Sequence, residues 1–280
     1  MTTRALVLGG GGVAGIAWET GILAGLADRG MDVTGADLVV GTSAGSTVAA
    51  QVTSGVPLAD LFDRLVVPAR TSGELTAPSA VASLEQLWMD MVANTSGPLE
   101  LRRAIGAMAL ATDTVPEEAR LQVIAGRLPR HTWPDRPVRI VAVDALTGDE
   151  RIFHEGGGVP LIDAVAASSS VPGIWPPVTI DGRRYIDGGI RSVLNADLAV
   201  GHDVVLILAP IDEPLPVGPD VAAGMEALEA RARIQFVRPD DASTAAFGPD
   251  LLDLASREPA ARAGRSQGQG LAESVRSFWT

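Results

Sequence analysis

The serine best suited to act as a nucleophile is Ser43, which lies in the stretch Gly41-Thr42-Ser43-Ala44-Gly45. An apolar segment, 37–40, precedes it and small residues follow it, which predicts a sharp turn from a strand into a helix. Gly41 and Gly45 lie two positions away on either side, where a Cβ atom would crowd such a turn. The turn would hold the hydroxyl above a helix N-terminus, whose partial positive charge suits a developing anion. We therefore interpret Ser43 as a nucleophile that needs a base, an oxyanion hole and a shaped pocket.

A run of glycines, Gly9 to Gly12, follows the first apolar segment and could supply the oxyanion hole. Glycines let the N–H groups of successive residues converge on one point, which creates a concave anion site. Two or three such donors, together with an N–H after the serine, could hold a tetrahedral oxyanion. The residues expected to contribute are Gly10, Gly11, Gly12, Val13 and Ala44, with Gly15 supporting the motif.

The same run also fits the dinucleotide-binding pattern G-x-G-x-x-G from Gly10 to Gly15. A dinucleotide site needs an acidic residue at the end of the following strand, but that strand ends in Thr42, and Asp32 and Asp37 lie before it. The dinucleotide interpretation would also leave the serine motif unexplained. A purely structural glycine turn is the third alternative, and it would cost unfolded-state entropy without an obvious packing need. We favour the oxyanion interpretation over NAD binding and expect no cofactor.

The general base is harder to assign, because none of the three histidines is well placed. His202 begins a predicted strand, whereas sites in open α/β sheets lie at the carboxyl ends of strands. His131 and His154 fit solvated surface positions better. The pattern therefore points away from histidine and towards a carboxylate, although a triad of Ser43, Asp187 and His202 stays open as an alternative.

Asp187 is the best-placed carboxylate. It follows a short strand, and Gly188 and Gly189 allow the backbone to approach closely there. Asp181-Gly182 is the same dipeptide, but it lies between two strand-like segments and fits a hairpin turn better. A turn or capping role is the structural alternative for Asp187 as well.

Alternating apolar and helical segments must position these residues. The first fifty residues follow the order strand, helix, strand, helix, which implies a parallel sheet with right-handed crossovers. The predicted strands are 5–8, 37–40, 138–143, 151–154, 178–180, 184–186 and 204–208, and the predicted helices are 16–29, 46–53, 58–65, 79–92, 99–110, 116–128, 160–167, 221–234 and 259–278. We find no linker or repeat and predict one domain over 1–280, with the signatures in 5–210 and a helical C-terminal extension, 211–280.

Composition narrows the function classes. The chain has 280 residues, no cysteine and a formal net charge of −12, and its histidines show no metal-ligand spacing. The missing cysteines exclude disulfides, thiolate metal sites and cysteine nucleophiles, and we expect no metal. The negative charge argues against nucleic-acid binding and disfavours electrostatic docking on anionic membranes. The N-terminus lacks signal-peptide features and no apolar run could span a bilayer, so we expect a soluble, cytoplasmic protein.

Three blocks together resemble the patatin-like phospholipases. They are Gly10 to Gly15, the serine motif and Asp187-Gly188-Gly189, and the stretch 167–177 with its following hairpin also resembles that family. The resemblance implies a three-layer α/β/α fold with a mostly parallel sheet, and a Ser43–Asp187 dyad without histidine. It also implies an oxyanion hole at Gly11, Gly12 and neighbouring N–H groups, an acyl-enzyme, no metal, and acyl lipids as substrates. In one departure, Ala14 stands where the family commonly carries Arg or Lys, which removes a cation close to the glycine loop.

Apolar spacing supports a further expectation. The segment 79–92 places Leu84, Leu87, Trp88 and Met91 on one helical face, which fits either a core-facing helix or a cap with Trp88 and Met89 along an acyl channel. No calcium-binding or membrane-targeting domain is recognised, so any transient contact with a membrane must use this domain's own surface. A non-catalytic lipid-binding module on the same fold is the alternative from another functional class. The sequence leaves the oligomeric state open.

Overall fold

The computed structural model describes residues 2–67, 73–77 and 81–280. Its centre is one eight-stranded sheet. The strands are β1 (Arg4–Leu8), β2 (Leu38–Thr42), β3 (Val138–Asp144), β4 (Glu150–Phe153), β5 (Val178–Ile180), β6 (Arg183–Asp187), β7 (Val204–Leu208) and β8 (Arg233–Val237). They follow the order β5-β6-β3-β2-β1-β7-β8, with β4 paired to β3 outside this path. The five strands from β3 to β8 in that order are parallel, whereas β4, β5 and β6 form antiparallel pairs.

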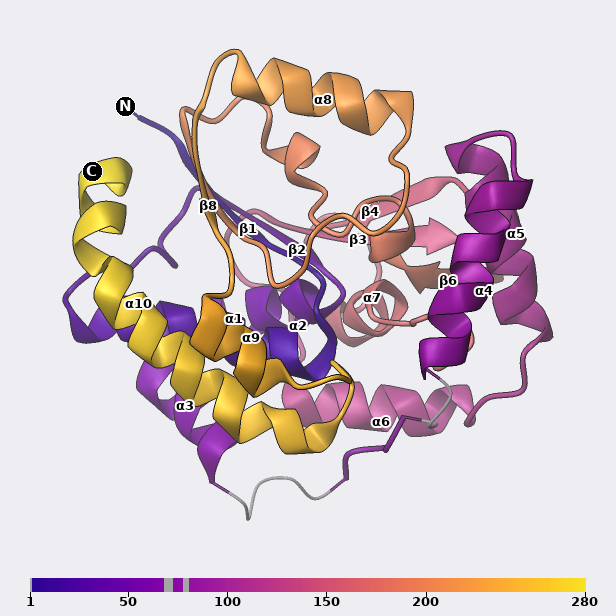
Figure 1. Cartoon of the computed structure of the whole chain (residues 1–280), viewed down its shortest axis with the longest axis horizontal. Helices are drawn as coiled ribbons and strands as arrows, with labels where there is room; N and C mark the ends of the chain where they lie inside the picture. The colour runs from indigo at the N-terminus through magenta and orange to yellow at the C-terminus, as the bar shows by residue number, and fades with distance from the viewer. Residues whose placement is uncertain (1, 68–72, 78–80) are drawn as a thin grey trace.

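Helices cover both faces of the sheet, as Figure 1 shows with α8 on one side and α1, α2 and α10 on the other. The α-helices are α1 (Gly12–Asp28), α2 (Ala44–Val52), α3 (Leu58–Val66), α4 (Val81–Asn94), α5 (Pro98–Ala111), α6 (Glu117–Arg127), α7 (Leu161–Ser168), α8 (Pro219–Glu229), α9 (Asp241–Phe247) and α10 (Arg257–Trp279). Short 3-10 turns are η2 (Gly188–Ile190), η3 (Ala196–Ala199) and η4 (Leu254–Ser256). The predicted three-layer α/β/α architecture is therefore confirmed.

Alternate residues of each central strand pack into separate cores on the two faces. Leu6 and Leu8 join the larger core with α1, α2, α7 and α10, whereas Ala5 and Val7 join a smaller core under η3 and α8. This division follows from the period of two in a strand, and it explains why the strands are apolar throughout. A third cluster joins α4 and α5 to the region after β6.

The pairing of β3 places the ends of β2 and β6 side by side. Ile140 and Val141 pair with both β2 and β4, so these two strands lie on opposite edges of β3. Ala142 pairs with both β4 and β6, so β6 must share the edge occupied by β2. Along that edge Thr42 pairs with Val141, and Asp187 pairs with the next residue, Ala142. The carboxyl ends of the two strands therefore meet one register step apart.

Several predicted boundaries are wrong in an informative way. Helix α1 begins at Gly12 rather than Ile16, so the last glycine of the run is the first residue of the helix. The predicted helix 221–234 ends at Glu229, and the chain then forms strand β8 beside β7. The extension 211–280 is therefore not wholly helical. The predicted start of a helix at Ser79 lies outside the described residues.

The C-terminal helix packs against α1 through glycines on both helices. A Cβ at Gly21 or Gly25 would lie 2.3 or 2.1 Å from a backbone oxygen of α10. Gly264 and Gly268 have equally close contacts with the backbone of α1, at 2.5 and 2.3 Å. The two backbones can approach this closely only because four glycines remove the side chains between them. Helix α10 is thus built into the layer that supports the serine turn.

Candidate active site

The structure brings Ser43 and Asp187 together, although 144 positions separate them in the sequence. The Ser43 Oγ donates a hydrogen bond of 2.7 Å to the Asp187 Oδ2. Ser43 is 7% exposed and Asp187 is 5% exposed, so the pair is largely shielded from water. A hydroxyl bonded to a carboxylate at this distance is the arrangement that a nucleophile and its base require.

The backbone at Ser43 is strained, as expected for the predicted turn. Its φ of 52° and ψ of −113° are uncommon for a residue with a side chain. Gly45 makes the turn feasible, because a Cβ there would lie 2.0 Å from the Leu8 carbonyl oxygen. A Cβ at Gly41 would lie 2.6 Å from the Gly45 oxygen. The two flanking glycines therefore let β1, β2 and α2 meet closely enough to present the hydroxyl.

The Asp187 carboxylate is held at both oxygens. The Asp187 Oδ1 accepts a hydrogen bond of 2.7 Å from the Gly189 N–H, and Oδ2 accepts from Ser43. The backbone N–H of Asp187 donates to the backbone oxygen of Ser170 at 3.0 Å. Burial raises the pKa of Asp187 to about 7, against the opposing hydrogen bonds from Ser43 and Gly189 and the charge of Arg120. A Cβ at Gly188 would lie 2.2 Å from the Val141 oxygen, so this glycine allows the close approach to β3. The carboxylate can thus exchange a proton near neutral pH, as a general base should.

The glycine loop offers fewer donors than predicted. The Gly10 N–H is already bonded to the Val193 oxygen at 2.9 Å, so the prediction that it contributes to an oxyanion hole is wrong. Across the described residues, the N–H groups of Gly11, Gly12, Val13 and Ala44 have no protein acceptor. These four stay available as donors to an oxyanion at the Ser43 side of the loop. Gly15 supports the loop, since a Cβ there would lie 3.3 Å from the Ala44 side chain.

An apolar cavity of about 270 Å³ opens at the Ser43–Asp187 pair. Its walls include Trp88 and Met89 of α4 together with apolar side chains from four later segments, which follow α7, β6, β7 and α9. Trp88 also packs against the core cluster of α5, so helix α4 both packs on a core and lines the cavity. Leu87 is exposed and does not share the buried face, and the side chain of Leu84 lies outside the description.

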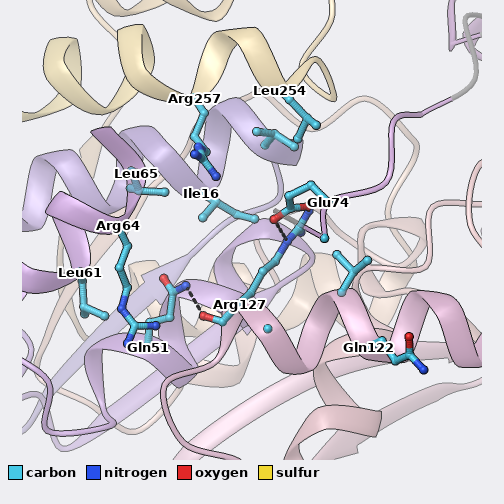
Figure 2. A pocket seen from close by; sticks show the side chains of 14 residues that line it. Ile16, Gln51, Leu61, Arg64, Leu65, Glu74, Gln122, Arg127, Leu254 and Arg257 are labelled. Carbon is cyan, nitrogen blue, oxygen red and sulfur yellow. Dashed lines mark hydrogen bonds and ion pairs between the residues drawn. The ribbon is translucent and has the colours of Figure 1, made fainter. Parts of the chain in front are cut away.

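A second cavity adjoins Ser43, and a third adjoins the second. A narrow cavity of about 20 Å³ contains Ser43, Ala44, Gly12 and Arg120 in its lining. It shares Val13, Ile16 and Arg127 with a larger cavity of about 430 Å³. We call the larger one the arginine cavity, because Arg64, Arg127 and Arg257 line it with Glu74, as Figure 2 shows.

Arg120 is the site residue that sequence reasoning missed. It lies on α6 and is 3% exposed, with its guanidinium 4.2 Å from the centre of the Trp175 ring. Its Nε and Nη1 have no hydrogen-bond partner among the residues that the structure describes. Burial and the charge of Arg127 lower its pKa to about 9. The sequence feature that could have revealed Arg120 is its position on the same helical face as Val123 and Ile124, three and four residues further along the helix.

Ala14 contributes no polar group and is fully buried in the larger core. Two serines of the stretch 167–177 support the pair instead. The Ser43 N–H donates to the Ser168 Oγ at 3.0 Å, and Ser170 accepts from Asp187 through its backbone. The resemblance in this stretch therefore corresponds to direct contacts with both candidate catalytic residues.

The histidines lie elsewhere. The His202 Nδ1 is 3.0 Å from the Ala199 oxygen, just before β7 and so at the end of the sheet opposite to Ser43. The His131 Nε2 is 3.0 Å from the Ala125 oxygen of α6, and the His154 Nδ1 accepts a hydrogen bond of 3.2 Å from the Gly156 N–H. None of the three touches the Ser43–Asp187 pair. Within the described ranges, no group of three or more His, Cys, Asp or Glu residues could hold a metal ion, and no helix is long and apolar enough to cross a membrane.

The chain is similar to several known proteins. Two curated relatives, uncharacterized NTE family proteins of Mycobacterium tuberculosis and Mycobacterium bovis, are each 30% identical to this chain over 204 residues. The match covers 70% of this chain and 47% of each relative, so the chain spans about half the length of these relatives.

Two solved structures are similar to this chain at TM-scores below 0.5. VipD from Legionella pneumophila has a TM-score of 0.46 at 12% identity, covering 98% of this chain and 67% of VipD. ExoU from the type III secretion system of Pseudomonas aeruginosa has a TM-score of 0.41 at 16% identity, covering 99% of this chain and 52% of ExoU. The family assignment does not depend on these two likenesses. The family model of patatin-like phospholipases matches residues 6–200, which include the glycine loop, the serine turn and Asp187, and the chain therefore belongs to the patatin-like phospholipase family.

Proposed function

We propose that this chain is a serine acyl hydrolase that releases fatty acids from lipid esters, as a phospholipase A or lysophospholipase would. One observation carries the proposal: the Ser43 hydroxyl is bonded to a buried carboxylate with a raised pKa, at the mouth of an apolar cavity. An apolar cavity with a few convergent polar groups is the usual form of a site for a lipid-like ligand.

In the first half of the proposed reaction, Asp187 accepts the Ser43 proton while the Ser43 Oγ attacks the ester carbonyl. The carbonyl oxygen becomes an oxyanion and accepts hydrogen bonds from N–H groups of Gly11, Gly12, Val13 and Ala44. Losing one donor of this kind typically lowers the rate by about 10²–10³. Protonated Asp187 then gives its proton to the leaving alcohol, and the acyl group stays on Ser43.

In the second half, Asp187 accepts a proton from a water molecule that attacks the acyl-enzyme. The acyl C–O bond to Ser43 breaks, the proton returns to the Ser43 Oγ, and a free fatty acid leaves. A raised carboxylate pKa suits this cycle, because the same group must accept and donate a proton in each half.

The test is hydrolysis of a short-chain p-nitrophenyl ester by the wild type, Ser43→Ala and Asp187→Asn. Each variant should lose most of the turnover, and wild-type rates in either one would contradict the proposed pair. His202→Ala serves as the control, since its ring lies at the far end of β7. A large loss in His202→Ala would instead favour the triad.

A binding module without catalysis is the second candidate, on the observation that both residues of the pair are nearly buried. A fluorophosphonate probe separates the two, because it labels an activated serine and leaves an inert one unmodified. Labelling of the wild type but not of Ser43→Ala supports the enzyme. A cytoplasmic location and transient contact with a membrane surface are parts of the proposal that localisation and vesicle-binding experiments would test.

A further inference from the structure

We propose that the arginine cavity binds the phosphate of an anionic lipid ester whose acyl chain lies in the apolar cavity and whose carbonyl lies at Ser43. The inference rests on the proposed function and adds a binding site for the alcohol part of the substrate. Its substrate class is an acyl ester of a phosphorylated alcohol, in preference to an uncharged glyceride.

The arrangement of the three cavities supports a substrate with two unlike ends. The apolar cavity and the narrow cavity share Gly12, Ser43, Val171 and Leu252. The narrow cavity in turn adjoins the arginine cavity, which is the most voluminous of the three at about 430 Å³. Ser43 therefore lines both the apolar cavity and the narrow cavity of about 20 Å³ that borders the arginine cavity. An acyl ester placed with its carbonyl at Ser43 would extend its chain one way and its alcohol the other.

The charge of the arginine cavity is opposite to that of the chain. The whole sequence has a formal net charge of −12. The lining of the cavity nevertheless includes Arg64, Arg127 and Arg257 against one carboxylate, Glu74. Like charges gathered in a partly enclosed space repel each other, and a bound anion relieves that repulsion. An excess of positive charge in an acidic protein therefore favours an anionic ligand.

Glu74 balances only one of these arginines. Its carboxylate accepts two hydrogen bonds from Arg127, at 3.0 and 2.6 Å. Burial raises the pKa of Glu74, but the hydrogen bond from Arg127 and the charges of Arg127, Arg120 and Arg257 lower it below its ordinary value, so all three guanidinium groups act on this one carboxylate. In Figure 2, Arg257 reaches from α10 towards the Arg127–Glu74 pair. Neither Arg64 nor Arg257 forms an ion pair with a described carboxylate within 4.0 Å.

Arg120 supplies an independent indication of an anion-binding site. It is almost fully buried, yet its Nε and Nη1 have no partner among the described residues, and it lines the narrow cavity beside Ser43. Leaving buried donors of a charged group unpaired is costly, so such groups normally meet an acceptor. Guanidinium groups match phosphate oxygens with paired hydrogen bonds. A phosphate between Arg120 and the arginine cavity would satisfy these donors.

The kinetic experiment compares two substrates with the same medium-length acyl chain, a lysophosphatidate and a monoacylglycerol, below the concentrations at which they aggregate. They differ only in the phosphate. The wild type should prefer the lysophosphatidate, and Arg257→Gln should lower the ratio of the two kcat/KM values by at least about tenfold, as expected for a lost charged hydrogen bond. Arg262→Gln is the matched control, because Arg262 lies on the same helix but is exposed and pairs with Glu258. An unchanged ratio in Arg257→Gln, or an equal fall in the control, would overturn the inference.

A binding experiment separates this inference from the proposed catalysis. The Ser43→Ala protein should bind the lysophosphatidate more tightly than the monoacylglycerol, and adding Arg257→Gln should weaken that binding. Inorganic phosphate should bind more weakly than the lysophosphatidate; equal affinity would identify the cavity as a site for free phosphate and refute the lipid assignment. Failure of the wild type to hydrolyse any ester would count against the proposed function alone. If Arg257→Gln melts far below the wild type, Arg64→Gln on α3 takes its place in both experiments.

Discussion

Replacing Asp187 with Asn should make the protein inactive and more stable, and the size of the gain should depend on pH. Burial raises the pKa of Asp187 from an ordinary value of 3.8 to about 7. One pKa unit corresponds to about 1.36 kcal/mol, so ionising this carboxyl in the folded protein costs about 4 kcal/mol relative to the unfolded chain. An asparagine in the same place is never ionised, and its oxygen can still accept from Gly189.

The sign of the effect follows from where the proton is held more tightly. The folded state binds it more tightly than the unfolded state, so this group's contribution to stability is fully present below about pH 4 and is lost between about pH 4 and 7. Asp187→Asn should therefore match the wild type at low pH. At pH 8 it should gain up to about 4 kcal/mol, which amounts to roughly 5–10 °C in melting temperature.

The assay combines melting curves at several pH values with hydrolysis of a p-nitrophenyl ester. Activity should fall by about 10²–10⁴, the usual contribution of a general base. Asp181→Asn is the matched control, since Asp181 occupies the same Asp-Gly dipeptide but lies exposed in the hairpin turn with φ 50°. A variant that melts no higher than the wild type at pH 8, or that keeps its turnover, would refute the reasoning about Asp187.

Three further predictions concern the pair, the cavity and the helix packing. The wild-type kcat/KM should rise with pH and level off above about 7, because only ionised Asp187 can accept the proton; a flat profile from pH 5 to 9 would contradict this. Trp88→Ala should shift the preferred acyl chain length, measured with a series of p-nitrophenyl esters, whereas Leu87→Ala on the exposed side should not. Gly268→Ala should destabilise the protein by about 1–3 kcal/mol, because a Cβ there would lie 2.3 Å from a backbone oxygen of α1. Gly270→Ala on the same helix has open space and should be neutral or slightly stabilising in urea denaturation.

Local features of the sequence were enough to predict the serine turn and the fold class. The spacing of Gly41 and Gly45 around Ser43 is a backbone requirement, and close approach of neighbouring atoms imposes it within a few residues. Uniformly apolar strands alternating with helices indicate a parallel sheet for the same local reason. Asp181-Gly182 was predicted as a hairpin turn because both residues can adopt positive φ, and both do.

Only the tertiary structure decided which groups surround Ser43. Its contact with Asp187 depends on β2 and β6 sharing one edge of β3, which is a matter of strand order and register rather than of local pattern. The N–H of Gly10 donates instead to the backbone oxygen of Val193, a residue far along the chain. Arg120 enters the site from α6, where the sequence alone shows only an arginine on the same helical face as Val123 and Ile124.

The sequence alone thus determined the candidate nucleophile, the type of turn that presents its hydroxyl and the layered fold, since each is set by short-range sterics and by the periodicity of apolar residues. The tertiary structure decided the partners of Ser43, the unpaired Arg120 and the charged cavity beyond it. These features join side chains from α6, α10 and the strand ends, so they exist only once distant segments have packed. Electrostatic effects such as the raised pKa of Asp187 likewise depend on burial, which no single segment possesses by itself.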